Sequence, residues 1–255
     1  MEFAKKFLNS AWMLLLILFV VCGCASSDVL SKSDISVEEL ERRMTLKNDP
    51  SGNYRKSKSF KFVQTVKIPQ FLDEDIESMV ETKMVVPDKF RITTFKDNKP
   101  QQIICSNGRH GWMADASGKK LKRLEGEQLQ QLLTLSRFST PDVGYKSVFK
   151  EVKIFRCSNE EGNFYLLDCV GRNGNTFKIY VDAKDFLLRR MSGKLKFGSG
   201  YLNYDSRILG YGLYDGVMIP KKSESVQNGQ KQVVELVKYE LNVPIPARDF
   251  LPPVF

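Results

Sequence analysis

Hydrophobic and polar residues alternate along most of the chain from Ser57 to Leu241. In the first such segment, Phe60, Phe62, Val66 and Ile68 face one side, and Ser59, Lys61, Thr65 and Lys67 face the other. A period of two residues predicts a β-strand with one apolar face. The period recurs in segments 77–86, 89–95, 101–105, 110–116, 119–124, 147–157, 163–171, 176–197, 216–226 and 232–241.

Turn-forming pairs separate these segments: Pro87-Asp88, Asp97-Asn98, Asn107-Gly108, Ser117-Gly118, Asn173-Gly174, Ser192-Gly193, Asp215-Gly216 and Asn228-Gly229. Strands joined by such turns form an antiparallel meander. We interpret segment 182–191 as a hairpin rather than a short helix, because the period of two continues through it.

Two segments have helical periodicity instead. Ser36 and Glu39 fit a capping box, and the apolar residues after Ser36 predict a helix over Val37–Leu46. A second helix is expected over Glu125–Phe138, with Leu129, Leu132, Leu133 and Phe138 on one stripe. Two short helices cannot cover a long one-faced sheet, so the sheet must close into a barrel or curl around the helices and leave an apolar cavity.

The N-terminus has the layout of a secretory signal. Lys5 and Lys6 precede the apolar run Ala11–Val21, which is shorter than the roughly 20 residues of a membrane-spanning helix. The sequence Val21-Cys22-Gly23-Cys24 resembles the bacterial lipobox, which implies cleavage between Gly23 and Cys24 and lipidation of Cys24 by acyl chains such as palmitate. An ordinary signal peptide or an uncleaved anchor is the alternative. A redox or metal-binding pair fits the hydrophobic setting less well.

Three regions follow from this reading: a signal peptide over 1–23, a lipidated tether over 24–35 and a single domain over 36–255. The tether expectation rests on the small, polar segment Ser26–Ile35. Ala25 and Ser26 after the cysteine resemble the enterobacterial sorting signal for the outer membrane, so we expect the domain in the periplasm.

The composition and net charge limit the classes of partner that the protein can bind. The chain has 255 residues and a net charge of +9, with 39 Lys and Arg against 30 Asp and Glu. This mild excess favours anionic lipid headgroups or an acidic partner, whereas nucleic acid fits an exported lipoprotein poorly. After processing, Cys105, Cys157 and Cys169 remain, and we expect three buried thiols rather than a disulfide.

Several short motifs together resemble the outer-membrane lipoprotein carrier and receptor superfamily, the LolA/LolB-like proteins. The motifs are "VVPDKFRI" (85–92), "CSNGRHGWMAD" (105–115), "YDGVMIPKK" (214–222) and the tail with Asn242, Ile245, Phe250 and Pro253. The resemblance covers most of 37–255 and implies a strongly curved antiparallel half-barrel, mainly β, enclosing short helices and a cavity for acyl chains. It also implies a role in lipoprotein localisation. The receptor of this superfamily is itself lipidated, so a lipidated Cys24 makes this chain more similar to the receptor than to the soluble carrier. The C-terminal strands of this chain are longer than those of the receptor.

The candidate acyl-cavity residues are the apolar side chains Phe60, Phe62, Met84, Phe90, Ile92, Trp112 and Leu124. A closed core is the alternative for each of them. In "KIPQFLDEDIE", Phe71 and Leu72 precede an acidic stretch and form a candidate membrane or transfer loop, unless they fold back onto the sheet. Arg91 and Arg190 are either gates to the cavity or strand residues that face solvent.

The sequence offers little support for a catalytic function. His110 is the single histidine of the chain, and no G-x-S-x-G motif accompanies it. We therefore expect no enzyme, no cofactor and no metal site, with acyl chains and a periplasmic carrier protein as partners. Two alternatives stay open: an envelope-stress sensor similar to RseB that binds a protein, and a hydrolase of envelope glycans or lipids.

Overall fold

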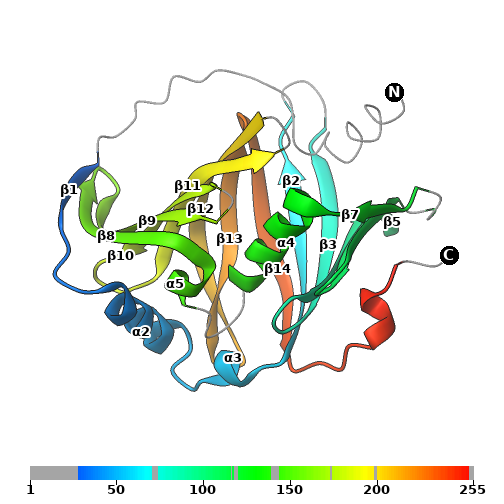
Figure 1. The fold of residues 1–255 in the computed structure, drawn as a ribbon, viewed down its shortest axis with the longest axis horizontal. Coiled ribbons are helices and arrows are strands. Elements are labelled where there is room, and N and C mark those ends of the chain that lie inside the picture. The colour runs from blue at the N-terminus through cyan, green and yellow to red at the C-terminus, as the bar shows by residue number, and fades with distance from the viewer. Residues whose placement is uncertain are drawn as a thin grey trace.

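All the strands of the computed structural model lie in one antiparallel sheet that remains open (Figure 1). The structure describes residues 28–70, 74–115, 117, 120–138, 144–172, 174–197 and 200–252. In these ranges the sheet has 14 strands in the order β1-β8-β9-β10-β11-β12-β13-β14-β2-β3-β4-β5-β6-β7. The mainly β half-barrel expected from the sequence is confirmed, with β1 and β7 as its two edges.

The strands are β1 (Val29–Lys32), β2 (Ser59–Ile68), β3 (Ile76–Val85), β4 (Lys89–Lys96), β5 (Lys99–Asn107), β6 (Gly111–Asp115), β7 (Lys122–Leu124), β8 (Phe149–Asn159), β9 (Gly162–Gly171), β10 (Thr176–Asp182), β11 (Leu188–Phe197), β12 (Gly200–Tyr214), β13 (Val217–Gln227) and β14 (Gln230–Leu241). The helices are α2 (Val37–Asn48), α3 (Asn53–Lys56), α4 (Gly126–Phe138), α5 (Tyr145–Val148) and the 3-10 helix η1 (Ala247–Phe250). No helix in the described ranges is both long enough and apolar enough to span a membrane.

The helices divide the sheet's inner face into two apolar cores. In the first, Val37 and Leu40 of α2 pack on β8–β11, where Tyr165, Leu167 and Ile179 are almost completely buried. The carboxylate of Glu41 accepts a hydrogen bond from the Tyr145 N–H and so joins α2 to α5. In the second core, α4 packs on β2–β7 (Figure 1). The two-residue periodicity predicted this inner face, because its residues alternate along each strand.

The C-terminal tail crosses the outer face of β3–β5. The Lys83 ammonium pairs with Asp249 at 2.9 Å, and the Cys105 thiol donates to the Leu251 carbonyl at 3.4 Å. Asn242, at a left-handed φ of 54°, receives the Lys58 N–H on its side-chain oxygen at 3.0 Å. The tail motif noted in the sequence therefore joins the end of β14 to the start of β2.

Cys105, Cys157 and Cys169 are buried free thiols outside any disulfide, as expected. Burial raises the pKa of Cys105 and of Cys157 to about 11, and that of Cys169 to about 12. All three thiols therefore stay protonated and unreactive near neutral pH.

Four features differ from the sequence-based expectations. The 15-residue strand β12 was not among the predicted strands. Residues Val29–Lys32, expected in the tether, form the edge strand β1, which pairs with β8 through its backbone. Ser192-Gly193, expected as a turn, lies inside β11, where the glycine permits close contact with β10. The short helices α3 and α5 were not expected, because a single turn has too few residues to show a period.

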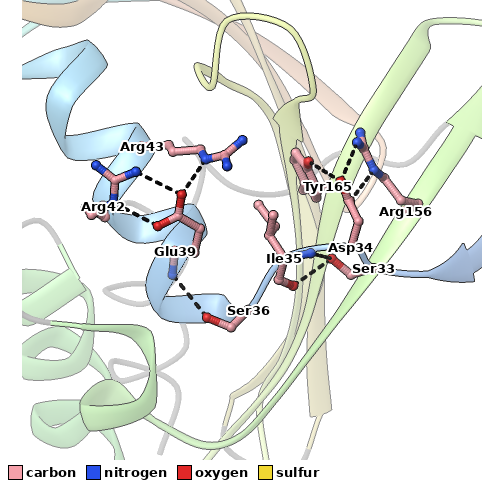
Figure 2. Close-up of polar contacts among 9 residues, drawn as sticks. All are labelled: Ser33, Asp34, Ile35, Ser36, Glu39, Arg42, Arg43, Arg156 and Tyr165. Atoms are coloured by element: carbon pink, nitrogen blue, oxygen red, sulfur yellow. Dashed lines mark hydrogen bonds and ion pairs between the residues drawn. The ribbon is translucent and has the colours of Figure 1, made fainter.

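The capping box at Ser36 is half formed. The Ser36 hydroxyl accepts the Glu39 N–H at 3.2 Å, but the Glu39 carboxylate accepts from the guanidinium groups of Arg42 and Arg43 at 2.7 and 2.6 Å (Figure 2). Hydrogen bonds from Arg42 and then Arg43 lower the pKa of Glu39 to about 2 from its ordinary 4.5. The nearby ion pair with Arg156 likewise lowers the pKa of Asp34.

These lowered pKa values predict acid release of the N-terminal segment. A carboxylate whose pKa is lowered on folding contributes its full stabilisation above its unfolded pKa and loses it as the pH falls toward the folded value. We expect the backbone amide NMR signals of β1 and the first turn of α2 to shift between about pH 4.5 and 2, before the signals of β9. An Asp34→Asn variant should show a smaller acid shift for β1, and β1 signals unchanged down to pH 2 would contradict the prediction.

Candidate functional site

An apolar cluster covers the inner face of β2–β7 beneath α4. Its buried members are Phe60, Met84, Phe90, Leu124, Leu129 and Leu133. Around them pack Tyr54, Phe62, Val86, Ile92, Ile104, Leu132, Met113, Tyr239 and Leu241. We call this set the α4 cluster. It draws on strands from β14 to β7, so the sheet's curvature gathers side chains that are far apart in the sequence.

The strand register explains how the cluster assembles. Phe60 of β2 is paired with Met84 of β3, which in turn is paired with Phe90 of β4. These directly opposed residues share a face of the sheet and stand close enough to pack. Six of the seven predicted cavity residues therefore lie together: Phe60, Phe62, Met84, Phe90, Ile92 and Leu124.

Trp112 lies apart from the other six. In β6, Met113 belongs to the α4 cluster, and Trp112 therefore projects from the opposite face, where it is paired with Cys105. Its ring centroid lies 6.1 Å from that of His110. The size and apolarity of the side chain made it a candidate, but the strand alternation set by Gly111, opposite Ser106, puts it on the outer face.

The space in which the sequence predicts an acyl cavity is occupied by α4 in this structure. Leu129 and Leu133 are only 8% and 5% exposed, and they pack against Phe60, Met84 and Phe90. At Gly111, an added Cβ would stand 2.7 Å from Leu129 Cδ1 and 3.3 Å from Leu124 Cβ. The missing side chain at Gly111 is therefore what lets α4 approach the sheet.

The closeness of Leu129 to Gly111 gives a direct test of α4 docking. We expect Gly111→Ala to push Leu129 outward and to speed hydrogen exchange of the α4 amides by roughly tenfold, which corresponds to about 1.4 kcal/mol of lost docking energy. Gly210→Ala is the control, because a Cβ at Gly210 meets no atom within 4 Å. Equal exchange of α4 in both variants would contradict this role of Gly111.

Aromatic rings line the end of the cluster nearest α3. The Tyr239 ring lies 6.0 Å from both Phe62 and Tyr214, and Tyr54 of α3 lies 5.1 Å from Phe60. Burial raises the pKa of Tyr239 and of Tyr54, so both phenols remain neutral. A neutral, aromatic wall suits an apolar ligand better than a charged one.

These tyrosines were not among the sequence candidates. Tyr239 and Leu241 are two residues apart in β14 and face the same side of the sheet. This two-residue period could have identified both as candidates from the sequence. Tyr54 had no such signal, since α3 is a single turn. Leu129, Leu132 and Leu133 were recognised as a helical stripe, but its position over the cavity residues depends on tertiary packing.

Both candidate gating arginines make contacts within the protein. The Arg91 guanidinium donates to the backbone carbonyl of Asp249 at 3.3 Å, and so helps to hold the tail on the outer face. The Arg190 guanidinium pairs with Asp205 and lies over the Tyr180 ring, 5.4 Å from its centroid. Neither belongs to the α4 cluster. Gly23, Cys24, Phe71 and Leu72 lie outside the described residues.

A separate depression of about 380 Å³ lies at the turn between β10 and β11, lined by Asn163, Asp182, Ala183 and Lys184. Three of its four lining residues have polar or charged side chains, and the Asp182 carboxylate already accepts hydrogen bonds from the Lys184 N–H at 2.8 Å and from Arg189 at 3.2 Å. Four residues at a turn offer an acyl chain little apolar area to bury. The α4 cluster is therefore the better candidate for an apolar ligand.

Comparison with known proteins identifies the fold. No protein-family model matches the chain, and no curated protein sequence does. A LolA superfamily protein from Nitrosomonas europaea is similar in structure with a TM-score of 0.61 and 14% identity, over 85% of this chain and 98% of that one. A putative outer membrane lipoprotein-sorting protein domain from Vibrio parahaemolyticus has a TM-score of 0.58 and 9% identity, over 84% and 97%. The protein described here thus has a LolA-like fold.

Proposed function

We propose that the protein binds acyl chains of lipoproteins or other lipids on the inner face of β2–β7, in the space that α4 occupies here. The observation that carries the proposal is the α4 cluster itself. It is broad and apolar, and it is covered by a single short helix rather than by a second sheet. Each methylene buried there contributes about 0.8 kcal/mol, so an acyl chain can replace the contacts made by Leu129 and Leu133.

The proposed cycle is an exchange between α4 and the ligand. α4 covers the cluster when no ligand is bound, and an entering acyl chain displaces Leu129 and Leu133 from Met84 and Phe90. No bond is made or broken in this exchange, so no catalytic residue is assigned. The similarity in fold to a protein described as an outer membrane lipoprotein-sorting domain supports this class of ligand.

We further propose that Cys24 is lipidated after cleavage at Gly23, and that the domain faces the periplasm from the outer membrane. Residues 24–27 then act as the tether, and Phe71 and Leu72 meet the membrane or the incoming lipoprotein. Labelled palmitate should be incorporated into the wild-type protein and not into Cys24→Ala. Equal labelling of the two proteins would contradict the proposed attachment site.

Displacement of a fluorescent fatty acid tests the ligand proposal. Phe62→Ser and Trp112→Ser form a matched pair, because both side chains are half-buried aromatic residues on opposite faces of the sheet. We expect Phe62→Ser to weaken fatty-acid binding by roughly tenfold, about 1.4 kcal/mol, and Trp112→Ser to leave it unchanged. Circular dichroism checks that both variants fold.

No displacement by the wild-type protein, together with no lipid in native mass spectra of protein purified without detergent, would contradict the proposal. If a protein partner co-purifies instead and survives Phe62→Ser, the sensor function becomes the better explanation.

A further inference from the structure

The first described residue of the chain is already fixed to the sheet. Asp28 accepts hydrogen bonds from the Asn159 side-chain amide at 2.9 Å and from the Tyr180 hydroxyl at 2.8 Å. Partial burial alone would raise the pKa of Asp28, but these hydrogen bonds outweigh it and lower the pKa. Val29 follows immediately and is paired with Ser158 of β8.

A second set of contacts holds the segment six residues later (Figure 2). The Arg156 guanidinium donates to both Asp34 carboxylate oxygens, at 2.7 and 3.1 Å, and lies over the Tyr165 ring, 4.1 Å from its centroid. Tyr165 also stacks on Phe186 of the turn between β10 and β11, with 6.1 Å between ring centroids. The Arg43 guanidinium of α2 lies over the Phe186 ring, 5.2 Å from its centroid.

These contacts set how far the domain can stand from a lipid anchor. Cys24 and Asp28 are four residues apart, and a fully extended chain spans at most about 14 Å over that distance. This inference rests on the proposed lipidation of Cys24. If Cys24 is held at the membrane surface, Asp28, just before β1, lies within about 14 Å of that surface, roughly twice the thickness of one headgroup layer.

The edge strand next to this tether carries exposed apolar side chains. Val29 is 67% exposed and Leu30 is 46% exposed, although both belong to a strand. The neighbouring charges are largely paired: Arg156 with Asp34, and Glu161 with Arg207 at 2.6 Å. Lys32 at the end of β1 is exposed and suits an anionic headgroup.

We propose that the β1 edge is the membrane-facing side of the domain, with Val29 and Leu30 in contact with the lipid surface. β7 is the other edge of the sheet, and the α4 cluster lies on that half. The half of the sheet that carries the proposed acyl-binding face therefore lies away from the anchoring membrane, where a soluble carrier can reach it.

Nitroxide labels on the full acylated chain in vesicles of phosphatidylethanolamine and phosphatidylglycerol test this orientation. Val29→Cys and Leu213→Cys are a matched pair, because these side chains are 67% and 68% exposed. Leu121→Cys, next to β7, reports on the opposite edge. The native thiols, buried and with raised pKa values, do not compete for the label.

We expect the label at residue 29 to relax faster with lipid-soluble oxygen than with an aqueous nickel complex, by at least roughly twofold relative to residues 213 and 121. A flexible Gly/Ser linker of about ten residues inserted after Ser27 should abolish the difference. A water-exposed label at residue 29 in the acylated protein would overturn the proposed orientation, and so would intact mass without an acyl group on Cys24. Fatty-acid displacement by the same samples reports separately on the proposed function, so the two failures can be told apart.

Discussion

Gly193→Ala is expected to lower the free energy of unfolding by roughly 3 kcal/mol, the largest stability change that we predict. A Cβ on Gly193 would stand 2.0 Å from the Thr176 carbonyl oxygen and 3.2 Å from the Phe177 Cα. Both contacts are with backbone atoms of β10, so no side-chain rotation can relieve them. β10 and β11 would have to separate over the core under α2, where Phe177 and Leu195 are buried.

Urea unfolding followed by circular dichroism measures this effect. The midpoint should fall with little change in slope, because the surface exposed on unfolding stays similar. Gly210→Ala, in β12, has open space for its Cβ and should unfold close to the wild-type midpoint. An unchanged midpoint for Gly193→Ala would show that β10 and β11 do not approach each other as described.

Leu133→Ala is expected to tighten fatty-acid binding by roughly tenfold while it lowers the stability of the domain by about 2 kcal/mol. Leu133 is 5% exposed and packs in the α4 cluster. If α4 and the acyl chain compete for one surface, weaker docking of α4 raises the fraction of protein that can accept a ligand. Stability and affinity therefore change in opposite directions.

These opposite changes in affinity and stability distinguish an α4 that a ligand can displace from an α4 that is a permanent part of the core. Gln130→Ala alters an exposed residue of the same helix and should change neither quantity by much. Calorimetric unfolding and fluorescence displacement on the same samples give both numbers. A parallel loss of affinity and stability in Leu133→Ala would mean that Leu133 forms part of the ligand site.

Alternation along the strands was sufficient to predict which side of β2, β3 and β4 faces inward. The apolar positions of β2, β3 and β4 were assigned to one side, and Phe60, Met84 and Phe90 meet there through strand register alone. The same reasoning failed at Trp112. Its strand has only five residues between turns, too few to decide from the sequence which of them face inward. Met113, its neighbour, is the residue that faces α4.

Contacts between distant segments could not be predicted in this way. β1 is a short edge strand held by backbone pairing, and its composition resembles a linker. Asp28 and Asp34 are fixed by Tyr180 and Arg156, more than a hundred residues away in sequence. Ser192-Gly193 has the composition of a turn, but the glycine is required by close packing of β10 and β11.

Photocrosslinking with a diazirine fatty acid, followed by peptide mapping, tests most directly whether acyl chains bind on the inner face of β2–β7. Crosslinks are expected on the peptides that carry Phe60, Met84 and Phe90 and on the α4 segment 126–138, and excess unlabelled fatty acid should suppress them. Crosslinks confined to outer-face positions such as Trp112, or insensitive to competitor, would contradict binding on the inner face.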